Sequence, residues 1–373
     1  MSSASELRVD LGAINENLRI AGERAAGRAV LAAVKADAYG HGLVEVSRSI
    51  QEAGTAQWLG VALVSEGRQL RAAGITLPVL KFTLTCPDEL ADALEAQLVL
   101  TVADQPGIDA VAAAAASAGL VAPVHLKVDT GMRRIGAEPG DAVALARRVA
   151  ENEHLALDGL YTHLPVSDVP DGVDFTRDQL ALFESVAADV RAAVGPVPWV
   201  HAANSGAVLG HDLGSTNLVR PGIMVYGSYP DPETPHTREL RPVERWTARV
   251  AFVKQVRAGE SVGYGRTWTA PRDTWVATVG IGYGDGYSRL LSNRGRMLVG
   301  GRSYPVVGRV CMDQTMLDLG PDSGGVSAGD EAVLVGRDGG EEIRTAEIAE
   351  LMGTIPYEVT CLVTSRVPRR YVG

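Results

Sequence analysis

The sequence predicts an α/β fold in which an N-terminal (β/α)8 barrel precedes a smaller, mostly-β domain. Over roughly the first 240 residues, short aliphatic runs alternate with longer stretches whose apolar residues recur at helical spacing. About eight such runs occur, the number of strands that a closed barrel needs. After the Pro-rich segment 229–235, short alternating runs separated by Gly and Asp dominate, which is typical of an all-β domain. We therefore expect a barrel domain over residues 1–240 and a β domain over residues 241–373.

The expected barrel strands follow one another along the chain. They cover residues 29–34, 59–63, 78–82, 98–102, 124–128, 157–162, 199–202 and 218–220. The helices between them have recognisable limits: residues 64–73 stop before Gly74, Asp104 is an N-cap for the stretch to Ser117, and residues 174–194 carry apolar side chains at helical spacing. An open doubly wound sheet fits the same alternation, but no G-x-G-x-x-G follows the first strand, which weakens that alternative.

The second domain is expected to consist mainly of short strands. They cover residues 247–256, 275–279, 296–299, 304–310 and 331–335. One helix, residues 345–352, ends before Gly353, a residue common just after helix C-termini.

Composition excludes several classes of partner. The chain has 373 residues and a net charge of -10, so it offers no basic stripe to neutralise nucleic-acid phosphates. Its start lacks the regions of a signal peptide, and the longest apolar stretch, residues 111–124, is too short to span a bilayer. The three cysteines are odd in number and have no C-x-x-C spacing, which indicates neither a disulfide framework nor a zinc site. We expect a cytoplasmic protein with no nucleic-acid, membrane or metal partner.

The segment AVKADAYGHG, residues 33–42, places Lys35 where an apolar run ends and a glycine-rich turn begins. Burial at such a position lowers the pKa of an amine and frees its lone pair for Schiff-base or proton-transfer chemistry. Tyr39, four residues further on, brings a hydroxyl to the same region. The alternative is an ordinary strand-end lysine whose amine reaches solvent.

Other chemically capable residues also fall just after expected strands, where (β/α)8 enzymes carry their active sites. They are Lys127, Asp129 and Arg134 after the fifth strand, His163 after the sixth, Asn204, Ser205 and Gly206 after the seventh, and Arg220, Gly222 and Ile223 after the eighth. Ser205 and Gly222 offer a hydroxyl and close backbone N–H groups, which suit a phosphate. Each residue alone has an ordinary structural explanation. Their convergence on one end of a barrel indicates an active site.

The chain resembles the alanine racemase family over essentially its whole length. The motifs that carry the resemblance are VKADAYGHG at 34–42, DTGM at 129–132, VGYG at 262–265, GRVCMDQ at 308–314 and PYE at 356–358. The resemblance implies a pyridoxal 5'-phosphate enzyme with an N-terminal barrel and a C-terminal β domain. It also implies interconversion of L-alanine and D-alanine in the cytoplasm, which supplies D-alanine for peptidoglycan.

The resemblance also implies roles for individual residues. Lys35 holds the cofactor covalently, and Arg220 faces its ring nitrogen. The cofactor phosphate and its surroundings involve Tyr39, Asn204, Ser205, Gly222, Ile223 and Tyr357. His163 lies between Arg220 and a tyrosine base.

That base is Tyr264, which in this family comes from the other subunit of a homodimer. Arg134 and the backbone N–H of Met312 hold the substrate carboxylate, and Lys127 takes a position that is often a carbamylated lysine. Racemisation needs a base on each face of the substrate, and Lys35 and Tyr264 form a chemically sensible pair. A tyrosine has a pKa of about 10, so neighbouring cations must favour its phenolate.

Some features leave alternatives open. Residues 164–171 read LPVSDVPD where the family usually has an Ala-rich stretch, so Asp168 or Asp171 takes the acidic role. Racemisation of another small amino acid such as serine remains the main rival, because an apolar pocket rejects one extra hydroxyl only about a hundredfold. Decarboxylases of basic amino acids, which place a carboxylate at the ring nitrogen, rank lower. A non-catalytic pyridoxal-phosphate carrier ranks lower too, because those carriers lack a second domain.

Overall fold

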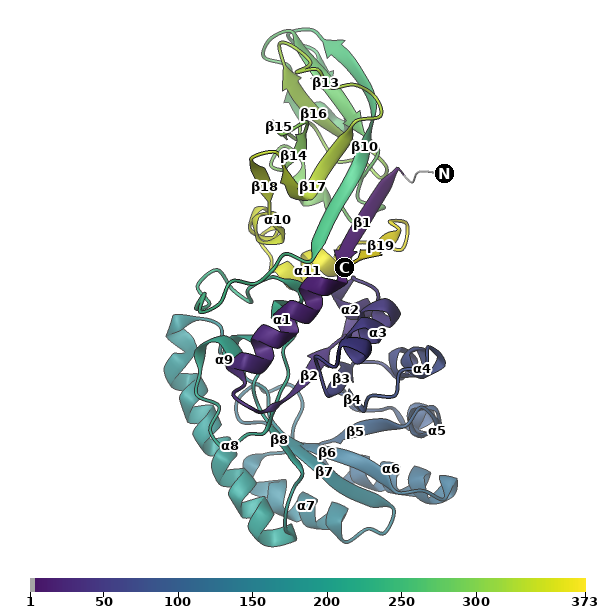
Figure 1. The fold of residues 1–373 in the computed structure, drawn as a ribbon, viewed down its shortest axis with the longest axis vertical. Coiled ribbons are helices and arrows are strands. Elements are labelled where there is room, and N and C mark those ends of the chain that lie inside the picture. Colours follow the sequence, from purple (N-terminus) through teal and green to yellow (C-terminus); the bar gives the residue numbers. More distant parts are fainter. Residues whose placement is uncertain (1–3) are drawn as a thin grey trace. The chain divides into compact units, whose positions relative to one another are not determined.

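Eight parallel strands form a nearly closed barrel in this computed structural model, which describes residues 4–373 (Figure 1). In spatial order the strands are β8 (Trp199–His201), β7 (Leu155–Tyr161), β6 (Ala122–Lys127), β5 (Leu98–Val102), β4 (Val79–Lys81), β3 (Trp58–Val61), β2 (Ala29–Ala33) and β9 (Leu218–Val219). Backbone hydrogen bonds from Asn217 N to Val200 O (2.9 Å) and from Arg220 N to Ala203 O (2.8 Å) join the chain segments of β8 and β9. The predicted fold class is confirmed, and each expected barrel strand is found within a few residues.

Helices alternate with most of these strands. They are α1 (Leu11–Arg24), α3 (Leu43–Ala53), α4 (Val64–Ala72), α5 (Leu90–Glu95), α6 (Gln105–Ala118), α7 (Ala142–Ala150), α8 (Val173–Val194) and α9 (Ser205–Gly210). Asp104 caps α6 as expected, since its carboxylate accepts a 2.8 Å hydrogen bond from Gly107 N. In the part of the chain from residue 4 onward, no helix combines the length and apolar character needed to cross a bilayer.

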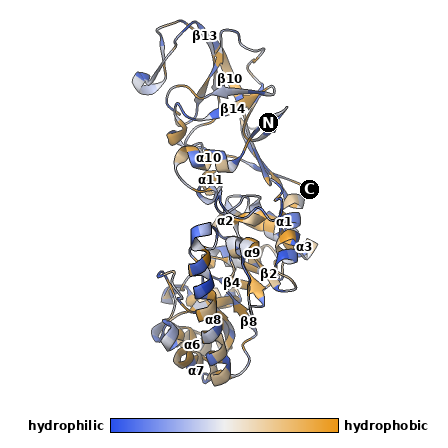
Figure 2. Ribbon diagram, turned by 90° about the vertical axis from the view of Figure 1, so that its left-hand side faces the viewer, coloured by the Kyte–Doolittle hydropathy of each residue, from blue (hydrophilic) through white to orange (hydrophobic). Residues whose placement is uncertain are grey.

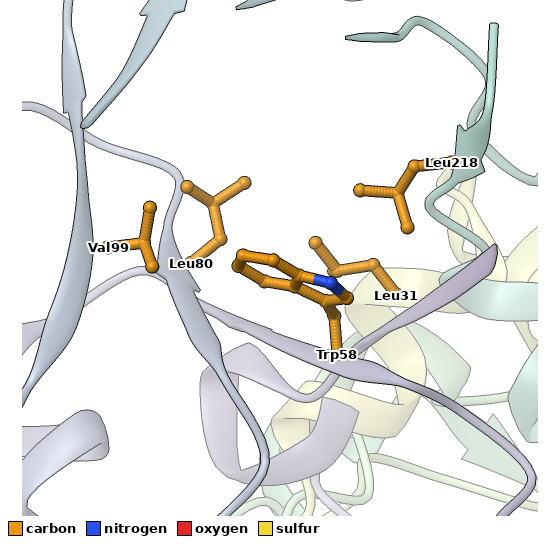
Figure 3. Close-up of a cluster of buried hydrophobic side chains, with 5 residues drawn as sticks. All are labelled: Leu31, Trp58, Leu80, Val99 and Leu218. Atoms are coloured by element: carbon orange, nitrogen blue, oxygen red, sulfur yellow. The ribbon is translucent and has the colours of Figure 1, made fainter. Parts of the chain in front are cut away.

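An apolar cluster fills part of the barrel interior. Its members Leu31, Trp58, Leu80, Val99 and Leu218 come from five different strands. Figure 3 shows the Trp58 indole lying between Leu31 and Leu80, and all five side chains are at most 5% exposed. The barrel strands are coloured mainly as hydrophobic in Figure 2, whereas its helices also carry hydrophilic stretches. Burial of these large side chains is the main source of the barrel's stability.

The described chain divides into two units. The barrel unit consists of Ile14–Ala38 and Gly42–Arg241, and the β unit consists of residues 4–13, Tyr39–His41 and Pro242–Gly373. The chain passes from the barrel unit to the β unit between Arg241 and Pro242. Residues 4–13 and the short segment Tyr39–His41 also belong with the β unit.

A nine-stranded sheet forms most of the β unit. Its path runs β15 (Arg302–Pro305), β14 (Arg296–Val299), β17 (Glu331–Asp338), β10 (Glu244–Val256), β1 (Ser5–Asp10) and β19 (Arg369–Val372), with β13 (Thr274–Val279), β16 (Thr315–Gly320) and β18 (Glu341–Ile343) attached. A separate ribbon pairs β11 (Ser261–Val262) with β12 (Trp268–Thr269). Two helices, α10 (Thr345–Met352) and α11 (Pro356–Leu362), follow the sheet in sequence.

Strand β1 corrects the expected limits of the first domain. Its residues pair antiparallel with β10 and parallel with β19, so they extend the sheet of the β unit and not the barrel. The expected strand at 304–310 is also too long: β15 ends at Pro305, and Val306 forms only an isolated bridge with Leu317. A proline offers no N–H to continue a ladder, and Gly308 has a positive φ of 74° that turns the chain.

Candidate active site

Lys35 lies two residues beyond β2 and begins an unusual turn. The next four residues, Ala36 to Tyr39, all have φ between 53° and 55°, the left-handed helical conformation. This conformation costs roughly 1–2 kcal/mol for each residue that carries a β-carbon. Runs of such residues persist only where the surrounding structure holds them, and they concentrate at functional sites. The turn therefore marks Lys35 independently of any motif.

Two carboxylates hold this turn within the barrel unit. Glu66 accepts a 2.6 Å hydrogen bond from Ala36 N, and its other oxygen accepts from the N–H groups of Ala62 and Leu63. Asp37 Oδ1 accepts from Leu43 N at 2.7 Å. Charge-assisted bonds of this kind are the stronger class of hydrogen bond, so they offset part of the backbone cost.

Arg220 directly follows β9 and is buried, with 5% of its surface exposed. Its Nη2 donates to Thr162 O (2.8 Å) and Ala202 O (2.9 Å), and its Nη1 donates to His201 Nδ1 (2.8 Å). Among residues 4–373 no hydrogen-bond acceptor meets its Nε–H. Burial lowers the pKa of Arg220 to about 10, which still leaves a cation at neutral pH. The guanidinium is thus held through both Nη atoms and keeps its Nε–H for a ligand.

His163 and Lys127 lie in the same electrostatic environment as Arg220. His163 Nδ1 is 3.4 Å from Arg220 Nη2, and burial together with the charges of Arg220 and Lys127 lowers the pKa of His163 well below its usual range. Burial, with Arg220 second, lowers the pKa of Lys127 to about 8. The Lys127 amine and the Arg220 guanidinium each lie 5.3 Å from the centre of the Tyr161 ring. The cluster is strongly cationic and favours an anionic ligand.

Asp129 organises the loop that carries Arg134. Its carboxylate accepts from Gly131 N (2.8 Å) and Arg134 N (3.2 Å). Although burial opposes it, these backbone hydrogen bonds and one from Arg133 lower the pKa of Asp129. Arg134 itself is exposed, so its guanidinium is accessible to a substrate carboxylate.

Ser205 joins the loops that follow β8 and β9. Its Oγ accepts from Gly222 N at 2.9 Å and lies 3.4 Å from Met224 N. Ile223, between them, begins the short helix η4 (Ile223–Tyr226) and is fully buried. A hydroxyl and successive backbone N–H groups are thereby gathered at one place, which suits a phosphate.

Asn204 is occupied by its own loop. Its Oδ1 caps α9 by accepting from Ala207 N (3.1 Å) and also accepts from Ser167 Oγ (2.7 Å), while its Nδ2 donates to Leu164 O (3.0 Å). The unusual segment 164–171 is therefore fastened to the loop that holds Ser205. Burial raises the pKa of Asp168 in this segment.

The remaining expected site residues belong to the β unit. Tyr39 and Tyr357 have ring centroids 6.0 Å apart. Tyr264 starts the turn η5 (Tyr264–Arg266), flanked by Gly263 and Gly265 with φ of 72° and 70°. Tyr264 is 74% exposed and Met312 is 53% exposed.

Three buried polar residues were not expected from the sequence. His125, Tyr161 and His201 all lie inside the barrel, and Tyr161 stacks on His201 with ring centroids 4.8 Å apart. Each occurs within an otherwise apolar strand run, where a polar side chain requires a buried partner. A polar residue within an apolar strand run is therefore the sequence feature from which these three buried residues could have been predicted.

Comparison with known proteins agrees with this geometry. The model of the alanine racemase N-terminal domain matches residues 9–230, and that of the C-terminal domain matches residues 243–371. An alanine racemase from Cutibacterium acnes is 48% identical over 371 residues, covering 100% of this chain and 98% of that protein. The chain belongs to the alanine racemase family. It is therefore an amino-acid racemase, an isomerase, and depends on pyridoxal phosphate.

Solved structures of family members have the same fold. The alanine racemase from D-cycloserine-producing Streptomyces lavendulae superposes with a TM-score of 0.93 at 37% identity, covering 100% of this chain and 98% of that one. A histidine racemase from Leuconostoc mesenteroides superposes with a TM-score of 0.90 at 30% identity, with the same coverage. The fold therefore serves racemases whose names specify different amino acids.

The residues of the barrel unit fit pyridoxal phosphate. The partnerless Arg220 Nε–H matches a ring nitrogen that accepts a hydrogen bond, and the Ser205–Gly222 loops match a phosphate. Lys35 supplies the primary amine that an aldehyde cofactor requires, and the cationic surroundings match the anionic charge of the group.

Proposed function

We propose that this chain interconverts L-alanine and D-alanine with two bases, Lys35 on one face of the substrate and Tyr264 on the other. The observation that carries the proposal is the strained lysine turn after β2 in the same barrel as the partnerless donor of Arg220 after β9. The likeness to alanine racemases over the whole chain supports alanine as the substrate.

Each residue of the barrel unit has a definite task in this proposal. Pyridoxal phosphate, when bound, supplies the electron sink that makes the substrate α-proton acidic. Lys35 Nζ holds and moves a proton on its face, and Arg134 orients the substrate carboxylate. Arg220 donates a hydrogen bond without giving up a proton, because a guanidinium remains protonated far above neutral pH. Ser205, Gly222 and Ile223 orient the phosphate end.

We propose further that two copies of the chain form a homodimer with shared sites. Tyr264 and Met312 of one copy then complete the cavity of the other copy. Their high exposure supports this assignment, since a phenol that acts as a base needs a closed and cationic environment. Arg220 would supply the positive charge that favours the phenolate, and His163 would lie beside it as a neutral ring.

We place the reaction in the cytoplasm, where D-alanine would enter peptidoglycan precursors. No disulfide joins the three cysteines within residues 4–373, as suits a reducing compartment. The role in cell-wall synthesis follows from the family resemblance.

A substrate panel with chiral product analysis tests the proposal. We expect rapid interconversion of alanine and slower turnover of serine, while histidine serves as a bulky comparison. The phenol rings of Tyr264 and Tyr357 should restrict the side chain to about the size of a methyl group. If serine is turned over and alanine is not, the assignment of substrate is wrong, although the roles of the two bases survive.

Replacing Arg220 with Glu should increase transamination. A carboxylate at this position would let the ring nitrogen carry a proton, and the stronger electron sink would favour transfer of the amino group to the cofactor, with hydrolytic release of the carbon skeleton as a keto acid. We expect pyruvate release from alanine to rise by about tenfold or more relative to racemisation. Arg220→Lys, which keeps the positive charge, is the matched control. Equal ratios of pyruvate release to racemisation in Arg220→Glu and the unsubstituted enzyme would contradict this explanation.

Lys127 is expected to react with carbon dioxide. Its pKa of about 8 leaves a substantial fraction of neutral amine, and a carbamate there would be an anion beside Arg220 and Arg134. The reaction releases one proton, so carbamate should increase as the pH rises through 8. Carbon-13 NMR with labelled bicarbonate should reveal the carbamate carbon and its loss in Lys127→Arg. Lys81→Arg is the control, and a signal that persists in Lys127→Arg would refute the assignment.

A further inference from the structure

A continuous chain of hydrogen bonds crosses the barrel interior from Arg220. Arg220 Nη1 lies 2.8 Å from His201 Nδ1, and His201 Nε2 lies 2.9 Å from His125 Nδ1. His125 Nε2 then lies 3.2 Å from Asp158 Oδ2. Both imidazoles are completely buried, whereas the Asp158 side chain is 26% exposed. These hydrogen bonds therefore connect Arg220 with the carboxylate of Asp158 on β7.

Only one arrangement of protons satisfies every contact between neutral imidazoles. A guanidinium only donates, so His201 Nδ1 accepts and its Nε2 carries the proton. His201 Nε2–H then donates to His125 Nδ1, and His125 Nε2–H donates to Asp158. Burial, with the charge of Arg220 second, lowers the pKa of His201 well below its usual range, and burial lowers the pKa of His125 against the opposing effect of Asp158. Both rings are thus neutral. His201 donates to His125, and His125 donates to the carboxylate of Asp158.

The protein backbone is shaped to admit this chain. Gly159 follows Asp158, and a β-carbon there would lie 2.6 Å from three carbons of the His125 ring. The ring therefore lies flat against bare backbone, where any larger residue would displace it. On the other side, the Tyr161 ring stacks on His201 at an interplanar angle of 5°. The two imidazoles have little freedom to rotate.

This series of hydrogen bonds also links the buried positive charge of Arg220 to a negative charge. Within the described residues Arg220 forms no ion pair; its partners are two carbonyl oxygens and two neutral imidazoles. A buried charge is costly unless it is paired and hydrogen-bonded. Asp158 is the carboxylate that its hydrogen bonds reach, through rings whose dipoles are aligned. Hydrogen bonds in such a series polarise one another.

We infer that Asp158 is a positioning residue that acts on Arg220 through the two intervening histidines. The inference rests on the proposed function, because it takes Arg220 to meet the cofactor ring. Asp158 touches neither substrate nor cofactor. Its carboxylate fixes the proton arrangement of both imidazoles and thereby the direction in which the guanidinium presents its Nε–H.

A double-mutant cycle in the holoenzyme tests this action at a distance. Asp158→Asn keeps the shape of the side chain and removes the charge. It should lower kcat/KM by about tenfold, an effect similar to that of removing the carboxylate partner of a metal-binding histidine. In an Arg220→Lys background the same substitution should lower kcat/KM by less than about twofold, because Arg220, the residue through which it acts, is already replaced. A substitution that merely loosened the barrel would lower kcat/KM by the same factor in both backgrounds. That additive result would overturn the inference.

A matched control and a second variant keep the cycle interpretable. Asp109→Asn removes a surface carboxylate that pairs with Arg148 at 2.7 Å, outside the chain, and it should have the same small effect in both backgrounds. His125→Phe keeps the ring and removes both nitrogens, so it should reproduce the coupling to Arg220→Lys if Asp158→Asn does not fold. Additivity of His125→Phe with Arg220→Lys would also count against the inference.

Nitrogen-15 NMR of histidine-labelled holoenzyme gives a readout that does not depend on activity. The signals of His201 and His125 should show protonated Nε2 and unprotonated Nδ1 from about pH 6 to 9. In Asp158→Asn the His201 signals should shift together with those of His125, and unmoved His201 signals would overturn the inference. If the unsubstituted enzyme racemised no amino acid, the proposed function would fail, while this spectrum would still test the chain.

Discussion

Lys35→Ala should abolish both racemisation and covalent attachment of the cofactor. Without the amine at this position the barrel loses the group proposed to form the imine bond with the cofactor, and one of the two proposed bases is lost as well. We expect kcat/KM to fall by at least about a thousandfold, as is usual when a covalent catalyst is removed. The absorption band of the attached cofactor should disappear in the same variant.

The small number of lysines makes this test sharp. The chain contains four, Lys35, Lys81, Lys127 and Lys254. Borohydride reduction followed by peptide mapping should therefore place the cofactor on Lys35 alone. Lys81→Gln is the matched control, because Lys81 is buried at the end of β4 but donates to Thr83 Oγ1 and Leu84 O, both at 2.8 Å. Reduced cofactor on any other lysine would refute the assignment.

Tyr264→Phe should remove the second base while leaving cofactor attachment intact. Loss of a positioned general base typically costs about 10²–10⁴-fold in rate, and both reaction directions should fall because each proton is taken on one face and returned on the other. The absorption band of the attached cofactor should remain. Tyr283→Phe, which alters another exposed tyrosine of the β unit, should leave the activity unchanged.

Mixing two inactive variants tests whether the site is shared between copies. In a heterodimer of Lys35→Ala and Tyr264→Phe, one barrel keeps its lysine and receives an intact tyrosine from the other copy. Random reassociation should then restore about a quarter of the original activity, since half of the dimers each contain one intact site. If Tyr264 served the barrel of its own chain, no mixture would recover activity. A monomeric holoenzyme with full activity would also contradict the shared site.

The barrel was largely predictable from the sequence because parallel strands buried on both faces appear as continuous apolar runs. The run at 98–102 reappears as β5 without any shift, and α10 has the expected limits. Lys35, Arg220 and Ser205 were singled out for the same reason, since each lies within a few residues of the end of such a run, and their roles stay predictions.

The parts that escaped prediction depend on contacts between residues far apart in sequence. Strand β1 is short and amphipathic, and its place is decided by pairing with β10 and β19, more than 200 residues away. The left-handed turn at 36–39 contains two alanines, an aspartate and a tyrosine, and of these only the aspartate favours a positive φ. His125 meets His201 only once the barrel closes, so no spacing rule links them.

The left-handed turn also limits where the reactivity of Lys35 can exist. A short synthetic peptide spanning residues 34–42 would abandon this backbone, because nothing in it replaces Glu66 or the helix that follows Gly42. Its lysine would then behave like that of any solvated oligopeptide. The reactivity of the Lys35 amine is accordingly a property that the polypeptide gains on folding and loses on denaturation.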